Sequence, residues 1–204
     1  MPTRPSPSAE ARRLPAAARR RQLLDVALDQ FASSGFHATA MDDIAEAAGV
    51  TKPVLYQHFA SKRALYLELL GDVGDRLIDA IALATREAGS PREQVAAGFE
   101  AYVGVVANQH NAFRLLFGSG ARRDEQFAEA VSRTEEAIAG QIARLIEADV
   151  SPSHRQTLAW AIVGMSEGVI RRWIDDPQRP SPATLSRELS DLAWGGLRGV
   201  SRID

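Results

Sequence analysis

The sequence predicts an all-α protein with about nine helices and no β-sheet. Apolar residues recur at intervals of three and four along most of the chain, which is the spacing of one helix face. No stretch alternates apolar and polar residues in the manner of a half-buried strand. Serine–proline pairs at residues 90–91, 151–152 and 181–182 indicate helix starts, because a helix tolerates proline only in its first turn.

The composition is that of an ordinary globular protein, since 45% of the 204 residues are hydrophobic and 25% are charged. The chain has no cysteine and therefore no disulfide or zinc–thiolate site, and its four histidines lack the spacing of metal ligands. No stretch reaches the roughly 18 consecutive apolar residues that a membrane span requires, and no apolar segment follows the basic N-terminus as in a signal peptide. We therefore expect a cytoplasmic protein with no metal, no cofactor and no membrane contact.

Positive charge is concentrated at the N-terminus, where residues 1–21 hold one acid and six arginines, at positions 4, 12, 13, 19, 20 and 21. This distribution is expected of a segment that meets a polyanion, and a solvated basic tail is the alternative. Residues 1–15 contain four prolines and are predicted to form a flexible arm. Helical periodicity begins near Ala16 and stops at Gly35, which can take the left-handed conformation beyond a helix end.

Residues 41–59 have the pattern of two short helices joined by a tight turn at Gly49. Two aspartates, Asp42 and Asp43, suit the positive N-terminus of the first helix. Thr51 is a good N-cap for the second helix, whose first turn contains a proline.

Ile44, Ala45 and Ala48 of the first helix can pack against Val50, Leu55 and Phe59, which leaves one face of the second helix outward. That face is predicted to carry Lys52, Pro53, Val54, Tyr56, Gln57 and His58. Such side chains suit the major groove of DNA, because glutamine can bond adenine, lysine can bond guanine or phosphate, and valine can contact a thymine methyl group. Residues 16–62 would then form a three-helix helix-turn-helix domain that binds DNA, and an ordinary amphipathic helix pair with a solvated outer face is the alternative.

The remaining residues, 63–204, are predicted to form a helical bundle. Ser61 should cap a helix that carries Leu65, Leu69 and Val73 on one face and links the two domains. Further helices are expected at about residues 91–106, 111–117, 127–145, 152–174 and 182–197.

The segment from Gly35 to Leu65 closely resembles the N-terminal DNA-binding domain of TetR-type transcriptional regulators. The resemblance rests on the runs Met41-Asp42-Asp43-Ile44-Ala45, Ala48-Gly49-Val50-Thr51-Lys52 and Leu55-Tyr56-Gln57-His58-Phe59-Ala60-Ser61-Lys62. It implies a homodimer that binds a palindromic operator in double-stranded DNA, with a helical domain for ligand binding and dimerisation after the DNA-binding domain. In that family the positions that approach DNA match Lys52, Pro53, Val54, Tyr56, Gln57, His58 and Lys62, with Tyr56 and Lys62 on phosphate.

Five further residues complete the predicted DNA-binding set, namely Arg19, Arg20 and Arg21 at the start of the first helix, Thr39 and Thr51. The chain departs from the family pattern at two positions. Many members have serine or threonine where this chain has Ala40, so Thr39 is the expected cap of the second helix. Position 42 is often basic in the family, whereas Asp42 would be repelled by phosphate, so we expect no DNA contact there and assign Asp42 to the helix dipole.

The resemblance also implies a ligand pocket between the central helices of the bundle. The candidate lining residues are Phe99, Tyr102, Val106, Phe113, Leu116, Phe117, Trp160, Met165, Ile170 and Trp173. Simple core packing is the alternative for each of them. The last two helices are the expected dimer interface, for which large aromatic side chains are equally suited.

Short motifs in both halves look like a branch of actinobacterial regulators of fatty-acid synthesis that respond to long-chain acyl-CoA. The motifs are residues 52–59, 113–117, 163–166 and 193–197. They imply an apolar small-molecule ligand such as a long-chain acyl-CoA, with Arg114, Arg122 and Arg123 as candidate partners for the CoA phosphates. Repression is the commoner outcome in the family, but this branch includes activators, so the direction of regulation stays open.

Two other functions are compatible with parts of the sequence. A DNA-binding dimer without any ligand would have a filled core, and a helical enzyme would have a buried catalytic pocket. Residues 164–168 fit the hydrolase motif G-x-S-x-G, but hydrolases place that serine on a turn between strand and helix. Because the motif here lies within a helical pattern, we expect a regulator and not an enzyme.

Overall fold

The computed structural model describes residues 14–117 and 124–200, without the side chains of Leu116 and Phe117. Over these residues the chain forms nine helices and no strand, which confirms the predicted fold class. The predicted arm, residues 1–15, lies outside the described residues apart from Leu14 and Pro15. Among the described helices, none is both long enough and apolar enough to cross a membrane.

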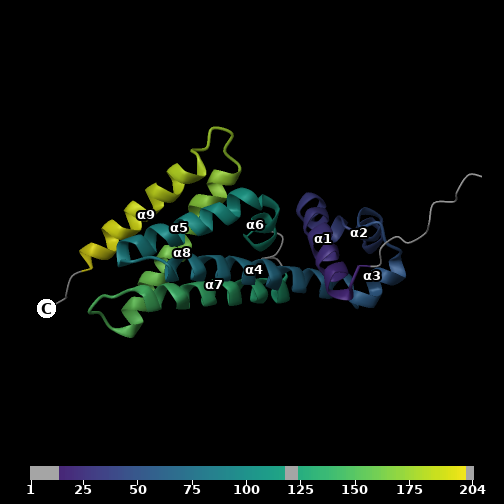
Figure 1. Cartoon of the computed structure of the whole chain (residues 1–204), viewed down its shortest axis with the longest axis horizontal. Helices are drawn as coiled ribbons and strands as arrows, with labels where there is room; N and C mark the ends of the chain where they lie inside the picture. Colours follow the sequence, from purple (N-terminus) through teal and green to yellow (C-terminus); the bar gives the residue numbers. More distant parts are fainter. Residues whose placement is uncertain (1–13, 118–123, 201–204) are drawn as a thin grey trace, which may run out of the picture.

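Helices α1, α2 and α3 form a unit at one end of an elongated molecule, which we call the head, and α4 leads from it into a bundle with α5 to α9 (Figure 1). In the bundle, α4 and α7 lie side by side along the long axis, and α5 packs against both α4 and α9. The bounds are α1 (Ala16–Ala38), α2 (Met41–Ala47), α3 (Lys52–His58), α4 (Lys62–Arg86), α5 (Pro91–Asn108), α6 (His110–Phe117), α7 (Glu125–Leu145), α8 (Pro152–Ile174) and α9 (Pro182–Gly199).

Side-chain caps fix the starts of the bundle helices. The hydroxyl groups of four serines accept a hydrogen bond from the backbone N–H three residues later, at Ser61, Ser90, Ser151 and Ser181. The last three are followed by the prolines that the sequence analysis used as helix starts. Helix α7 begins after Asp124, whose carboxylate accepts from the N–H groups of Gln126 and Phe127.

Two glycines adopt backbone conformations that shape the head. Gly49 has φ of 65° in the turn between α2 and α3, as predicted. Gly35 has φ of 79° and ψ of 164°, so it interrupts α1, and one further helical turn continues to Ala38. The helix that begins at Ala16 therefore loses its helical geometry at Gly35, where the sequence predicts its end. A short second helical segment follows the kink, because glycine can adopt this conformation without strain.

An aromatic cluster joins the head to the bundle. Phe31 and Phe36 from α1 lie against Tyr66 from α4, with ring centroids 4.9 and 5.0 Å apart. Phe127 from α7 completes the cluster at 4.8 Å from Phe36 and 4.5 Å from Tyr66. Burial raises the pKa of the Tyr66 hydroxyl to about 12. The core is thus continuous from head to bundle.

Candidate nucleic-acid interface and ligand cavity

The recognition face is the outward face of α3, which the buried Leu55 and Phe59 set by packing inward. Opposite them, Thr51, Pro53 and Gln57 are exposed, and Tyr56 is 43% exposed although it is a large aromatic residue. Val54 and His58 are half-buried at the edges of this face. Thr51 precedes α3 as predicted, but its side chain makes no capping hydrogen bond.

Lys52 and Asp42 form an ion pair beside this face, with Lys52 Nζ 2.9 Å from Asp42 Oδ1. The hydrogen bond to Asp42 raises the pKa of the Lys52 ammonium group. Asp43 stabilises the start of α2, because its carboxylate accepts a hydrogen bond from the Ala40 backbone N–H at 2.8 Å. Asp42 therefore has a definite partner on α3 that the helix-dipole assignment did not foresee.

Thr39 does not cap α2, which corrects the prediction made for it. Its side chain is buried, and its hydroxyl group donates toward the backbone oxygens of Gly35 at 2.8 Å and Gln30 at 3.2 Å. These oxygens belong to the C-terminal part of α1, where helical carbonyl groups lack partners within the helix. The hydroxyl therefore faces into the protein and away from any DNA phosphate.

Lys62, which was predicted to contact phosphate, is bonded within the protein in this structure. Its ammonium group donates to the backbone oxygens of Phe36 at 2.7 Å, Thr39 at 2.8 Å and His37 at 3.3 Å, and it lies 4.7 Å from the centre of the Phe36 ring. A lysine ammonium has three hydrogens, and these three contacts use all of them. Lys62 thus stabilises the link between α1 and α2.

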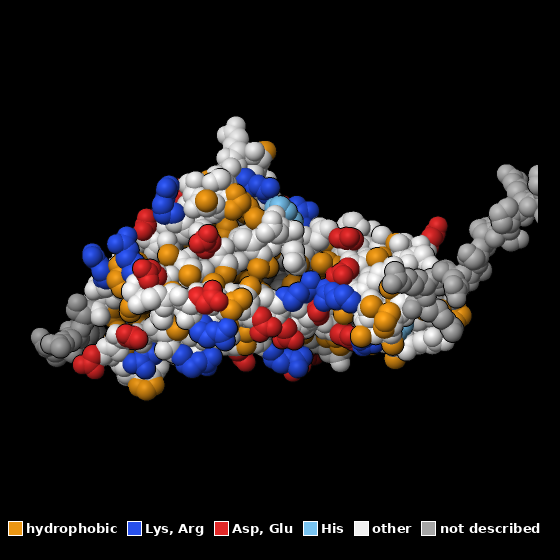
Figure 2. Space-filling view, viewed as in Figure 1, with side chains coloured by type: hydrophobic (Ala, Val, Ile, Leu, Met, Phe, Trp, Pro, Cys, Tyr) orange, Lys and Arg blue, Asp and Glu red, His pale blue; other side chains and the backbone are white. Residues whose placement is uncertain are grey.

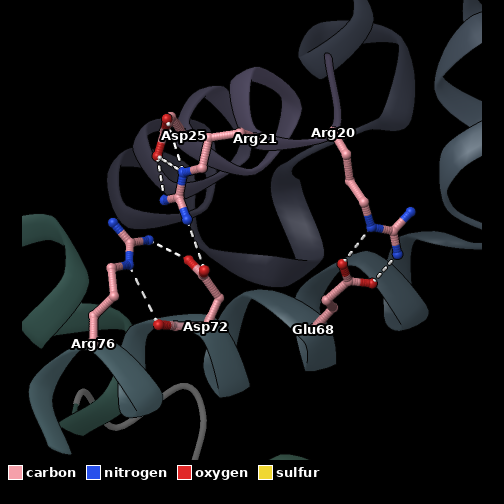
Figure 3. Close-up of polar contacts among 6 residues, drawn as sticks. All are labelled: Arg20, Arg21, Asp25, Glu68, Asp72 and Arg76. Atoms are coloured by element: carbon pink, nitrogen blue, oxygen red, sulfur yellow. Dashed lines mark hydrogen bonds and ion pairs between the residues drawn. The ribbon is translucent and has the colours of Figure 1, made fainter. Parts of the chain in front are cut away.

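Of the three predicted arginines, Arg20 and Arg21 bind carboxylates on α4 (Figure 3), although their side chains remain 40% and 38% exposed. Arg20 binds both carboxylate oxygens of Glu68, and Arg21 binds Asp25 on its own helix and Asp72 on α4, with Nη1 2.6 Å from Asp72 Oδ1. Arg19 bonds only Gln22 in the next turn, at 2.5 Å. These contacts follow from the fold, because α4 supplies carboxylates that lie 48 and 51 residues away in the sequence.

Lys and Arg side chains lie next to Asp and Glu side chains where α1 meets α4 (Figure 2). Arg76 completes this network by pairing with Asp72 (Figure 3). On α4, Arg63 binds Asp124 at 2.7 Å, and this hydrogen bond lowers the pKa of the Asp124 carboxyl group. Helix α4 is thus tied by charge to both α1 and the start of α7.

A cavity of about 880 Å³, including the part open to solvent, lies within the bundle. Helices α4, α5, α7, α8 and α9 all contribute to its wall. Most of the lining side chains are apolar, such as Ile81 on α4, Phe99 on α5 and Ile138 on α7. An apolar wall of this kind suits an apolar ligand.

The predicted ligand residues divide into three groups. Phe99 and Tyr102 line the cavity. Most of the others pack in or against the core and are absent from the cavity wall, namely Val106, Phe113, Met165, Ile170 and Trp173, and Trp160 is 38% exposed on the surface of α8. The side chains of Leu116 and Phe117 lie outside the described residues. Helical periodicity identifies a buried face without showing what that face contacts, so the sequence did not separate cavity-lining residues from core and surface residues.

The cavity wall also contains polar groups that sequence reasoning missed. Glu135 from α7 and Glu167 from α8 contribute carboxylates. Burial, followed by the charges of Glu167 and Glu135, raises the pKa of the Tyr102 hydroxyl group well above its ordinary value. No local signal distinguished these acids from the many glutamates on solvated helix faces.

Of the other predicted groups, Arg114 is absent from the cavity wall, whereas Ser166 belongs to it. Arg114 pairs with Asp175 at 2.9 Å, and Arg122 and Arg123 lie outside the described residues. Ser166 of the G-x-S-x-G motif lies within α8, where its hydroxyl group donates to the Ile162 backbone oxygen at 2.6 Å. That bond is the usual one for a serine inside a helix.

A three-helix head with an outward recognition helix, joined to a helical bundle that encloses a cavity, defines a helix-turn-helix DNA-binding regulator. The chain belongs to the TetR family of bacterial transcriptional regulators. The family models "Bacterial regulatory proteins, tetR family" and "Tetracyclin repressor-like, C-terminal domain" match residues 23–69 and 91–196.

Individual relatives agree with this assignment. The transcriptional activator FasR of Mycolicibacterium smegmatis is 35% identical over 92% of this chain and 87% of its own length. A TetR-like regulator from Rhodococcus sp. RHA1 has a TM-score of 0.76 at 32% identity, over 92% of this chain and all of that chain. FadR of Bacillus subtilis, solved in complex with stearoyl-CoA, shares the fold with a TM-score of 0.74 at 16% identity, over 86% of this chain and 98% of that chain. These relatives are regulators, not enzymes.

Proposed function

We propose that the protein binds a palindromic operator as a homodimer and that a long-chain acyl-CoA in the bundle cavity alters its affinity for that operator. The observation that carries this proposal is the combination of an exposed recognition helix with a mainly apolar cavity, joined by one helix, α4. The relatives add support, because one is an activator of the same family and another was solved with stearoyl-CoA.

For DNA contact we propose the outward side chains of α3 and its N-terminus. Val54, Tyr56 and Gln57 face outward or lie at the edge of this face, where they can reach base edges or phosphates. Thr51, Pro53 and His58 flank them, and Arg19 lies at the start of α1. Thr39, Lys62, Arg20 and Arg21 are left out of this set because each is bonded within the protein.

For dimerisation we propose the exposed faces of α8 and α9. Trp160 on α8 and Leu192 on α9 are 38% and 62% exposed, although both are large apolar residues. Glycines on the same two helices have open space where a side chain would be, at positions 164, 168, 195, 196 and 199. Helices that present small residues beside large apolar ones can approach each other closely. In a dimer of this kind, two recognition helices would lie one turn of DNA apart, about 34–36 Å.

For the ligand we propose an apolar chain inside the cavity with its polar head toward solvent. The wall is mainly isoleucine, valine, leucine and phenylalanine, which suits an acyl chain. Ile81 and Thr85 of α4 belong to this wall, and the same helix carries Glu68 and Asp72, which bind α1. A ligand that favours one position of α4 would therefore favour one orientation of the head, and the affinity for DNA would change by the ratio of the ligand's affinities for the two states.

The DNA part of the proposal is tested by measuring binding to the upstream region of the protein's own gene, with random duplex as competitor. Specific retention of a palindromic fragment is expected, and Tyr56→Ala should weaken it at least tenfold without loss of thermal stability, because Tyr56 is exposed. Phe127→Ala is the contrasting variant, because Phe127 is buried and its loss should lower stability. Failure of a genome-wide selection to yield any specific site would contradict this part.

The ligand part is tested by filling the cavity. Ile138→Trp adds a large side chain to the wall, and we expect it to remove the effect of palmitoyl-CoA on operator binding while leaving operator binding itself intact. Ala96→Trp adds the same side chain at an exposed position of α5 and should leave the response unchanged. If the unaltered protein binds its operator and no acyl-CoA changes that affinity, the protein is a DNA-binding dimer with another ligand or none.

A further inference from the structure

The exposed Asp42–Lys52 pair connects the two helices of the helix-turn-helix. Asp42 is the second residue of α2 and Lys52 is the first residue of α3, and the turn at Gly49 brings them together. The Lys52 ammonium lies 2.9 Å from Asp42 Oδ1 and 3.1 Å from Asp42 Oδ2, so it sits between both oxygens. Both side chains are more than half exposed, at 54% for Lys52 and 64% for Asp42.

The pair has little to do with holding the fold together. Ion pairs between exposed side chains contribute little to stability, because water solvates both charges well and the pair must order two side chains. The packing of α2 on α3 is carried by buried residues, namely Ile44, Ala45, Leu55 and Phe59. The effect of the pair is therefore expected on the affinity of the recognition face for DNA.

At the N-terminus of the recognition helix, a free lysine would be a general phosphate contact. Contacts of this kind supply nearly all of the affinity for DNA of random sequence, because each releases condensed counterions and none reads a base. A carboxylate that binds the ammonium competes with phosphate for it and so reduces that contribution, and it also places a negative charge where a phosphate would approach.

We propose that Asp42 is a specificity-determining residue that keeps Lys52 in a neutral pair and so suppresses binding to non-operator DNA. The exposed residues of α3 that can read bases, Tyr56 and Gln57, have no such carboxylate partner among the ion pairs of the described residues. The pair therefore weakens binding to random DNA more than binding to the operator, and it raises the ratio of operator affinity to random-DNA affinity. This inference rests on the proposed role of α3 as the DNA-reading helix.

The test measures binding of the full-length protein to a random duplex and to its operator, between about 50 and about 200 mM salt. For Asp42→Asn we expect tighter binding to the random duplex, with the slope of log Kd against log salt steeper by about 1.8 for a dimer, since each released contact adds about 0.9. Over this fourfold range of salt, that change in slope corresponds to about a twelvefold change in relative affinity. Operator affinity should rise less, so the ratio of operator to random binding falls.

Two controls separate the pair from a general effect of charge. Glu46→Gln removes a negative charge from another exposed position of α2 and should leave the salt slope unchanged. Asp42→Asn combined with Lys52→Met should show no gain over the unaltered protein. The inference is overturned if Glu46→Gln steepens the slope as much as Asp42→Asn, if the double variant keeps the gain, or if Asp42→Asn leaves binding to the random duplex unchanged. Because the random duplex needs no operator, these outcomes are independent of whether the proposed operator exists.

Discussion

Arg20 on α1 binds Glu68 on α4 through two hydrogen bonds, from Nε to Oε1 at 2.8 Å and from Nη2 to Oε2 (Figure 3). The same guanidinium group donates to the backbone oxygen of His58 at 2.6 Å and lies 4.4 Å from the centre of the Phe59 ring. One side chain thus joins the start of α1, the end of the recognition helix and the first half of α4. The head therefore cannot tilt relative to α4 without breaking this arrangement.

Arg20→Gln should mainly lower stability. Loss of charge-assisted hydrogen bonds to a partly exposed partner should reduce the free energy of unfolding by about 1–2 kcal/mol. The salt slope of binding to random DNA should not change, because the guanidinium is directed at Glu68 and not at phosphate. Urea denaturation and a salt titration measure the two quantities. A slope reduced by about 1.8 with unchanged stability would instead identify Arg20 as a phosphate contact in both subunits.

Lys62→Met should destabilise the head by about 2–3 kcal/mol, because it leaves backbone oxygens in the last turn of α1 and just after it without their charged donor. Methionine keeps most of the length and apolar character of the lysine side chain, so the loss reports on the ammonium group. Denaturation in urea gives the value. Little change in stability together with a large loss of affinity for all DNA sequences would restore the phosphate contact that the family resemblance implies for Lys62.

Gly74→Ala should destabilise the contact between α4 and α7. A Cβ atom at Gly74 would overlap the Thr134 hydroxyl group, and overpacking of this kind costs about 1–3 kcal/mol. Gly71→Ala is the matched control on the same helix, where the Cβ atom would meet open space. Since alanine favours a helix over glycine, Gly71→Ala should raise stability by up to about 1 kcal/mol. Equal thermal shifts for the two variants would show that the approach of α7 does not depend on Gly74.

Asp124 should make stability depend on pH in the acid range. The hydrogen bond from Arg63 lowers the pKa of its carboxyl group in the folded protein. A carboxyl group with a lowered folded pKa stabilises the protein above its unfolded pKa, and this stabilisation is lost as pH falls through the folded pKa. The urea midpoints of the unaltered protein and of Asp124→Asn should therefore differ at pH 6 and converge as pH falls below about 4. A difference that is constant with pH would mean that the charge of Asp124 is not involved.

Asp72→Asn should weaken the coupling between the cavity and the head. Asp72 binds Arg21 on α1 and Arg76 on α4, so it is the acid shared by the two arginines. We expect palmitoyl-CoA to bind the variant with unchanged affinity but to alter its operator affinity less than in the unaltered protein. The reason is that the variant weakens the contact through which a shift of α4 would change the orientation of the head. Asp75→Asn, at an exposed position on the same helix, is the control. An equal response in both variants and the unaltered protein would remove this network from the mechanism.

Local signals were sufficient for the helices and for the recognition face. The serine caps before α4, α5, α8 and α9 act within one turn of the chain, and the turn at Gly49 needs only a residue that accepts positive φ. Apolar spacing showed that Leu55 and Phe59 turn inward, which is confirmed, and so it also gave the outward face of α3. Composition and these patterns together predicted an all-α protein.

The tertiary structure alone decided which charged residues remain available and which apolar residues enclose the cavity. Arg20 and Arg21 read as a basic patch in the sequence, but α4 places Glu68 and Asp72 beside them. Among ten predicted pocket residues, only Phe99 and Tyr102 are among the described cavity-lining residues, because helical periodicity marks a buried face but not the neighbour it meets. The reason is the same in both cases. Helix formation and capping depend on residues within a few positions, whereas ion pairs and cavities depend on helices that lie far apart in the chain.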